Sequence, residues 1–65
     1  MEDKMKDFLR WFVNHYGSIT TTEALLAISM AGHFHIHTRQ AKELIGNCRM
    51  LGCVSKHKEC ITIKI

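Results

Sequence analysis

Three histidines spaced two residues apart are the first candidates for chemistry in this 65-residue chain. His33, His35 and His37 alternate with Phe34 and Ile36. In an extended segment, residues two apart lie on one face, so the three imidazoles could chelate a metal ion such as zinc or nickel. A turn between two helices would break that alignment and leave the histidines on the surface. No acidic residue stands between them to complete a ligand set.

A second group of potential metal ligands lies near the C-terminal end. Cys48, Cys53, His57 and Cys60 fall within thirteen residues, but their spacing differs from the CxxC pairs that are typical of zinc sites. Cys48 lies on the apolar side of a predicted helix, and the other two cysteines lie on predicted strands, where cysteine commonly packs as a small hydrophobic residue. We therefore expect free thiols in a reducing compartment, and neither a metal site nor a cofactor.

Catalytic and membrane-targeting motifs do not occur in the sequence. It has no Gly-rich phosphate loop, no G-x-S-x-G and no H-E-x-x-H, so we expect a protein that is not an enzyme. The first 17 residues lack the apolar core of a signal peptide, and no stretch approaches the ~18 apolar residues of a membrane span. These patterns predict a cytoplasmic protein without a membrane partner.

Positive charge is concentrated in the second half of the chain. Residues 1–37 contain three basic and four acidic residues, whereas residues 38–65 contain six basic and two acidic residues. This asymmetry favours a polyanionic partner, which for a soluble chain is usually nucleic acid. A basic balance is also common in small cytoplasmic proteins, so the charge alone leaves both interpretations open.

Apolar residues recur at helical spacing in three segments. The spacing predicts helices over residues 4–16, 21–31 and 39–51, which share one small core within a single domain, residues 1–65. A domain of this size buries only about 60% of the surface of its unfolded chain, so its stability is marginal. The predicted inward faces consist of Met5, Phe8, Leu9, Phe12 and Tyr16 in the first helix, Ala24, Leu25, Ala27, Ile28 and Ala31 in the second, and Ala41, Leu44, Ile45, Cys48 and Leu51 in the third.

The ends of these helices have recognisable signals. Thr20 and Glu23 form a potential capping box for the second helix. Thr38 is a favourable N-cap for the third helix, and Gly52 is a favourable residue just beyond its end. The alternation of residues 33–37 predicts that Phe34 and Ile36 turn toward the core and the histidines toward solvent.

The C-terminal residues change to a period of two. Ile61, Ile63 and Ile65 alternate with polar residues, which predicts a half-buried strand. A second short strand is predicted at residues 53–55, with the charged residues 56–59 as the tip of a β-hairpin. Residues 18–20 form one further brief strand before the second helix.

This order of elements resembles the winged helix-turn-helix superfamily. The resemblance covers nearly the whole chain, with residues 20–54 similar to the helix-turn-helix and residues 52–65 similar to the wing. The most similar stretch is LIGNCRMLGCV, in which an apolar helix end turns at Gly52 into a strand. The resemblance implies an α+β fold, a three-helix winged helix-turn-helix with a C-terminal β-hairpin wing. It also implies a small DNA-binding transcription regulator, or an excisionase-like accessory factor of a phage or mobile element.

The resemblance further implies that helix 39–51 lies in the major groove of double-stranded DNA and that wing 55–59 contacts the backbone or minor groove. The residues support this separately, because Arg can bind guanine, Gln or Asn can bind adenine, and Glu can accept from cytosine. Gly46 would allow close approach, and histidines beside a phosphate would bind it more strongly at lower pH. The candidate DNA-binding residues are Thr38, Arg39, Gln40, Lys42, Glu43, Asn47, Arg49, Lys56, His57 and Lys58.

Three alternatives remain open at this point. The chain could be a winged-helix protein-interaction module, an inhibitor or assembly factor without DNA binding, with Trp11, Met30 and Met50 as exposed contacts. It could be a metal-responsive regulator that uses its histidines. Trp11 could cover the edge of the core, or it could pair two copies in a homodimer together with Val13 and His15; the free edge of the hairpin is another surface for pairing. Such a homodimer would bind two DNA half-sites.

Overall fold

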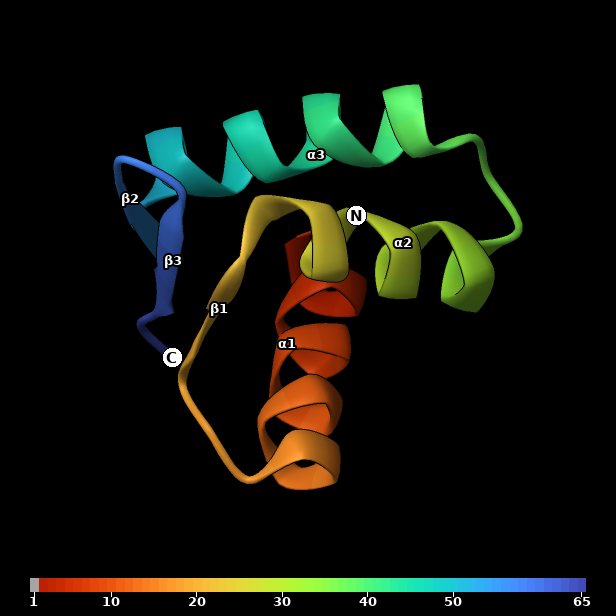
Figure 1. The fold of residues 1–65 in the computed structure, drawn as a ribbon. Helices are drawn as coiled ribbons and strands as arrows, with labels where there is room; N and C mark the ends of the chain where they lie inside the picture. Colours follow the sequence, from red (N-terminus) through yellow and green to blue (C-terminus); the bar gives the residue numbers. More distant parts are fainter. Residues whose placement is uncertain (1) are drawn as a thin grey trace.

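The computed structural model describes residues 2–65 and contains three helices and a three-stranded sheet (Figure 1). The elements follow the order α1 (Glu2–Tyr16), β1 (Thr20–Thr22), α2 (Glu23–Phe34), α3 (Thr38–Leu51), β2 (Val54–His57) and β3 (Cys60–Ile63). In Figure 1 helix α3 crosses above α1 and α2, and the β2–β3 hairpin lies below the C-terminal end of α3. The predicted α+β class and the predicted number of helices are therefore confirmed.

The sheet joins the hairpin to the helical part of the molecule. Its strands are antiparallel in the order β1-β3-β2, so β3 lies in the middle. Thr20 pairs with Thr62 on one side of β3, and Val54 pairs with Ile63 on the other. The brief strand predicted at residues 18–20 lies instead two residues later, where three threonines can pair with β3.

The hairpin turn is shorter than the sequence predicts. Lys56 and His57 were assigned to the tip, but both lie in β2, and His57 pairs with Cys60. Only Lys58 and Glu59 form the loop, with Lys58 at a φ of 58°. Such a tight loop needs a left-handed residue, which here is a lysine rather than a glycine.

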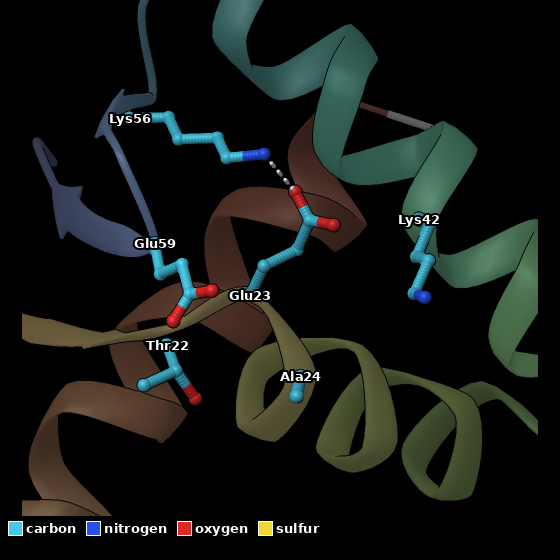
Figure 2. A pocket seen from close by; sticks show the side chains of 6 residues that line it. All are labelled: Thr22, Glu23, Ala24, Lys42, Lys56 and Glu59. Atoms are coloured by element: carbon cyan, nitrogen blue, oxygen red, sulfur yellow. Dashed lines mark hydrogen bonds and ion pairs between the residues drawn. The ribbon is translucent and has the colours of Figure 1, made fainter.

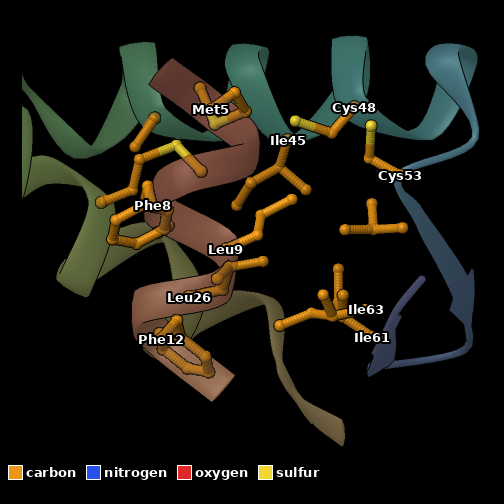
Figure 3. Close-up of a cluster of buried hydrophobic side chains, with 14 residues drawn as sticks. Met5, Phe8, Leu9, Phe12, Leu26, Ile45, Cys48, Cys53, Ile61 and Ile63 are labelled. Atoms are coloured by element: carbon orange, nitrogen blue, oxygen red, sulfur yellow. The ribbon is translucent and has the colours of Figure 1, made fainter. Parts of the chain in front are cut away.

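Buried apolar side chains from every helix and from the hairpin form one cluster (Figure 3). The predicted face of α1 is confirmed except at Tyr16, and that of α3 is confirmed except at Leu51. Both exceptions are exposed and are the last residues of their helices. The buried residues are Met5, Phe8, Leu9, Phe12, Leu26, Ala27, Met30, Ala41, Ile45, Cys48, Cys53, Val54, Ile61 and Ile63.

The predicted inner face of α2 is confirmed only in part, at Ala27 and Ala31. The structure buries Leu26, Ala27 and Met30 but leaves Leu25 and Ile28 exposed by 41% and 61%. Helix α2 is apolar around most of its circumference, so the spacing of apolar residues does not determine which side faces the core. Burial of Met30 also removes it from the contacts expected of a protein-interaction module.

Two helix caps differ from the predictions. Thr20 lies in β1 and makes no capping box with Glu23; the N-cap of α2 is Thr22, whose Oγ1 accepts a hydrogen bond from the Leu25 N–H at 3.1 Å. Helix α2 also continues past the predicted end at residue 31, as far as Phe34, and His35 adopts a left-handed φ of 56° after it. Thr20 lies three residues before the helix, whereas Thr22 is the last residue of β1 and stands directly before α2, where a threonine side chain can cap the first turn.

Helix α3 also begins at a different cap from the predicted one. His37, not Thr38, is the N-cap, and its backbone N–H donates to Gln40 Oε1 at 3.0 Å. The predicted end at Gly52 is confirmed: its φ is 83°, and the Cys53 N–H donates to the Cys48 carbonyl at 2.9 Å. This 6→1 bond defines a Schellman motif, which a glycine in the left-handed region favours.

Candidate nucleic-acid interface

Helix α3 contacts the rest of the molecule along one side only. Ala41, Ile45 and Cys48 hold that side on the core, and Leu44 is partly buried at its edge. The opposite side lies on the outside of the molecule, along the upper edge in Figure 1. It presents the exposed side chains of Arg39, Lys42, Glu43, Asn47 and Met50, with Gly46 among them.

The cations on this side have no acidic partner at ion-pair distance. Within residues 2–65, neither Arg39 nor Lys42 forms a salt bridge, whereas Arg10 pairs with Asp7 on α1. An arginine and a lysine without bonded partners retain all their N–H donors for a ligand. The exposed side of α3 can therefore bind acceptors on a polyanion without first breaking an ion pair.

Two predicted contact residues at the start of α3 also have local roles. Gln40 Oε1 accepts the hydrogen bond from the His37 N–H, so this oxygen is occupied, while the amide nitrogen keeps two donors. Thr38 is the first residue of the helix rather than its cap. At this position the backbone N–H has no acceptor within the helix and can bind an anion.

One wing residue forms an ion pair with another element of the molecule. Lys56 Nζ lies 2.8 Å from Glu23 Oε2, and this ion pair links β2 to the start of α2 (Figure 2). The hydrogen bond from Lys56 lowers the pKa of the Glu23 carboxyl below its usual 4.5, against a smaller opposing effect of burial. The positive charges of Lys42 and Arg49 lower this pKa further. The ion pair of Lys56 therefore serves mainly to connect the hairpin to α2.

A pocket of about 350 Å³ surrounds this ion pair and has mixed charge. Figure 2 shows Glu23 between Lys56 of the hairpin and Lys42 of α3, with Glu59 nearby. Two carboxylates balance two ammonium groups here. The pocket therefore offers no net positive charge to a phosphate.

A second groove, on the other side of Lys56, has a different charge. It measures about 560 Å³ and is bounded by the second half of α3 and by β2. Arg49 and Lys64 supply two cations without a salt bridge among the described residues, Lys56 lines the groove but pairs with Glu23, and no acidic residue lines it. The sequence predicts that Lys64 adds electrostatic affinity, because the alternation of residues 61–65 separates it from the isoleucines. Ile61 and Ile63 are buried as predicted, but Ile65 lies beyond the end of β3 and is exposed. The remaining lining residues are Gly46, Met50, Gly52, Val54 and Ser55.

The three histidines serve different parts of the structure. His33 packs its ring on Phe8 and Trp11, with ring centroids 5.0 and 5.6 Å apart. His35 ends α2 and His37 begins α3. All three are exposed, while Phe34 and Ile36 pack against the core as predicted. Within residues 2–65, no group of three or more His, Cys, Asp or Glu side chains is placed to hold a metal ion.

The three cysteines differ in how far they are buried. Cys48 and Cys53 are buried and Cys60 is exposed, and none of the three forms a disulfide. Burial raises the pKa of the Cys48 thiol to about 11, and the neighbouring Cys53 adds to the shift. Cys48 is therefore protonated at neutral pH, which opposes the thiolate chemistry that metal binding requires.

Replacing Glu23 by glutamine is expected to lower the free energy of unfolding by less than about 1 kcal/mol at pH 7, because the ion pair with Lys56 is partly exposed. The folded-state pKa lies below 4.5, so the charged pair stabilises the fold above pH 4.5. This stabilisation is lost as the pH falls through the folded-state pKa. Chemical denaturation of both proteins at pH 7 and at about pH 3 would measure the difference.

The control for this prediction is Glu59→Gln. Glu59 lines the same pocket but forms no salt bridge with any residue in the range 2–65. A loss of stability that is equal at both pH values would contradict the role of the ion pair.

No helix among the described residues is long and apolar enough to cross a membrane. Comparison with known proteins finds no matching family, no matching curated protein and no matching solved structure.

Proposed function

We propose that this protein binds double-stranded DNA through α3 and the β2–β3 hairpin, as a small transcription regulator or an accessory factor of a mobile element. One observation carries the proposal: α3 rests on the core by one side and holds Arg39, Lys42 and Asn47 outward, without salt bridges to the rest of the described chain. An exposed helix with such side chains has the dimensions and the donors that the major groove accepts.

The arrangement of elements supports the resemblance to winged helix-turn-helix proteins. Helices α2 and α3 are joined by a short turn, and a β-hairpin follows α3 directly. Strand β1 pairs with β3, which ties the hairpin to the helices. In this arrangement α3 is the recognition helix and the hairpin is the wing.

The proposal assigns base contacts to the middle and first half of α3. Arg39 would bind guanine through two hydrogen bonds, and Asn47 would bind adenine. Glu43 lies between them and would accept from a cytosine amino group, at the cost of repulsion from nearby phosphates. Gln40 would contribute only its amide nitrogen, because its oxygen caps the helix.

Backbone contacts are assigned to the residues around the second groove and at the start of α3. Arg49 and Lys64 line this groove and form no salt bridge within the described residues. Lys58 and His57 lie exposed at the wing, and Thr38, the first residue of α3, is also exposed. These contacts would fix the position of α3 on the duplex without reading sequence.

The experiment that tests the proposal measures affinity for a random-sequence duplex at several salt concentrations. Neutralising about four phosphates would give a slope of about −3.6 for log K against log salt. Fluorescence anisotropy with a labelled duplex gives the slope directly. A binding constant that does not change with salt, or no binding at low salt, would overturn the proposal.

Gly46→Ala is expected to stabilise the protein and weaken DNA binding. Glycine within a helix lowers stability by about 0.5–1 kcal/mol relative to alanine, and an added Cβ at Gly46 meets nothing within 4 Å. The free energy of unfolding should therefore rise by this amount. The same Cβ would stand between α3 and a groove wall or phosphate, so affinity should fall about tenfold, equivalent to about 1.4 kcal/mol.

Asn14→Ala is the matched control for Gly46→Ala. Asn14 is exposed near the end of α1, and alanine improves helix propensity there as well. In Figure 1 this end of α1 lies away from α3. This variant should gain stability and keep its DNA affinity. If Gly46→Ala bound DNA as tightly as the control, the prediction that DNA approaches this glycine closely would be wrong.

A protein-interaction module remains the second candidate because of the end of α3. Met50 is 87% exposed and Leu51 is 56% exposed, which is unusual for two adjacent apolar side chains. Under this alternative, binding to a protein partner would change little with salt and would depend on Met50 and Leu51. The salt titration separates the two functions.

A further inference from the structure

Lys56 borders both the mixed-charge pocket and the second groove. In the pocket its ammonium group lies 2.8 Å from Glu23 Oε2 (Figure 2). In the second groove the other cations are Arg49 and Lys64, and no acidic residue lines it. Lysine carries its charge on a flexible four-carbon stem, so the ammonium group can turn from the pocket to the groove.

The charges around Lys56 explain why it binds Glu23 in the free protein. In the second groove its ammonium group would lie with the cations of Arg49 and Lys64, and like charges repel each other. In the pocket the Glu23 carboxylate attracts it. This balance changes when a phosphate enters the second groove, because the anion attracts the cations of all three residues.

Little free energy is needed to break the ion pair between Lys56 and Glu23. Their side chains are 30% and 31% exposed, so water reaches both charges. Glu23 also remains stabilised as an anion after Lys56 leaves, because it lies in the first turn of α2 and the positive charges of Lys42 and Arg49 lower its pKa. Losing such an exposed pair changes a binding constant by at most about fivefold.

We propose that Lys56 exchanges Glu23 for a DNA phosphate when the duplex binds, so that Glu23 lowers DNA affinity by competing for this lysine. The exchange rests on the proposed DNA-binding function and adds an internal competitor to it. The phosphate would lie in the second groove beside Arg49 and Lys64, which form no salt bridge within the described part of the chain. Its contact with Lys56 would complete a site of three cations.

Competition by Glu23 acts on the backbone contacts and not on the base contacts. A phosphate carries no sequence information, so the competition should lower affinity for every duplex by the same factor. Glu23 therefore makes DNA binding depend more on the contacts of α3 with base edges. Glu23→Gln should raise the affinity for a random-sequence duplex and for a selected duplex equally.

A double-mutant cycle of Glu23→Gln and Lys56→Met, measured by fluorescence anisotropy with a random-sequence duplex, tests the exchange. Glu23→Gln should bind DNA about threefold to fivefold more tightly than the natural chain, because Lys56 no longer has to leave a partner. Lys56→Met should bind more weakly than the natural chain, because one phosphate contact is lost. Adding Glu23→Gln to Lys56→Met should restore little affinity. Circular dichroism would verify that each variant is folded at the temperature of the measurement.

The salt dependence of binding reports which partner Lys56 has in the complex. If Lys56 binds a phosphate, the slope of log K against log salt should be shallower by about 0.9 for Lys56→Met and unchanged for Glu23→Gln. If Lys56 stayed on Glu23 in the complex, the slope would instead be unchanged for Lys56→Met and steeper for Glu23→Gln. This second pattern would overturn the exchange.

Glu59→Gln is the matched control, because Glu59 lines the same pocket but forms no salt bridge within residues 2–65. Removing this charge should change DNA affinity by the same factor in the natural chain and in Lys56→Met. If Glu23→Gln behaved like this control, only net charge would act and the exchange would be wrong. Absence of DNA binding in every variant would overturn the proposed function and the exchange with it, whereas DNA binding without coupling between Glu23 and Lys56 would overturn the exchange alone.

Discussion

Replacing Arg39 and Lys42 together by alanine is expected to weaken DNA binding about 100-fold at moderate salt. Both side chains are exposed on the outward side of α3, and neither is held by a salt bridge within residues 2–65. A two-bond contact from arginine to guanine contributes about 1–3 kcal/mol of discrimination, and a lysine beside a phosphate adds sequence-independent affinity. The slope of log K against log salt should become shallower by about 0.9 for each phosphate that the variant no longer neutralises.

The two single variants should differ in what they change. Arg39→Ala should relax the preference for one base pair, since arginine reads base edges, and selection from a random duplex library would detect this. Lys42→Ala should weaken binding by a similar factor on every sequence. A uniform effect of both variants would assign both residues to the backbone.

The control removes the same charge from another surface. Lys6→Ala together with Arg10→Ala takes two cations from α1, where Arg10 already pairs with Asp7. This control should change DNA affinity only through long-range electrostatics, which salt at about 0.15 M screens beyond about 8 Å. Equal losses of affinity in the control and in the α3 variant would mean that net charge, not α3, determines binding.

The sequence predicted α3 more completely than any other element. Its apolar residues repeat on one side while its charged residues occupy the other, so Ala41, Ile45 and Cys48 could be assigned to the core. Gly52 could be assigned to the end because a left-handed residue there favours glycine. The exposure of Arg39 and Lys42 follows from the same pattern.

Helix α2 shows where such patterns fail. With apolar residues on nearly every side, Leu25 and Leu26 are equivalent in the sequence, and only packing against α1, α3 and the sheet buries one of them. This ambiguity caused the wrong predictions at Leu25 and Ile28. An outward apolar side could not be recognised until the inward side was known.

Contacts between residues that are far apart in the chain could not be predicted from the sequence either. Lys56 and Glu23 lie 33 residues apart, and their ion pair exists because β1 ties the hairpin to the start of α2. No local pattern distinguishes Lys56, which pairs with Glu23, from Lys58, which lies in the loop. The groove lined by Arg49, Lys56 and Lys64 likewise requires α3 and β2 to be placed side by side.

Ile45→Ala is expected to lower the free energy of unfolding by about 2–5 kcal/mol. The side chain of Ile45 is fully buried and points from α3 into the cluster shown in Figure 3. A core of this size supplies only about 3–5 kcal/mol in total, so the variant should be close to unfolding at 25 °C. Thermal denaturation should show a fall in Tm of more than about 10 °C, since each kcal/mol corresponds to about 4–8 °C in a small domain.

Two variants determine whether this loss of stability comes from the buried cavity. Ile45→Val removes one methyl group and should cost about 0.5–1.5 kcal/mol, leaving a folded protein that binds DNA. Met50→Ala lies further along the same helix, almost wholly exposed, and should change stability by less than about 0.5 kcal/mol. If Met50→Ala destabilised the chain as much as Ile45→Ala, the exposed end of α3 would be covered in solution.

Ile45 also holds α3 in place on the core. The apparent DNA affinity of Ile45→Ala should therefore fall with the fraction of folded protein, and this affinity should return at lower temperature as that fraction rises. A loss of affinity that persists in the fully folded variant would mean that Ile45 also sets the position of α3.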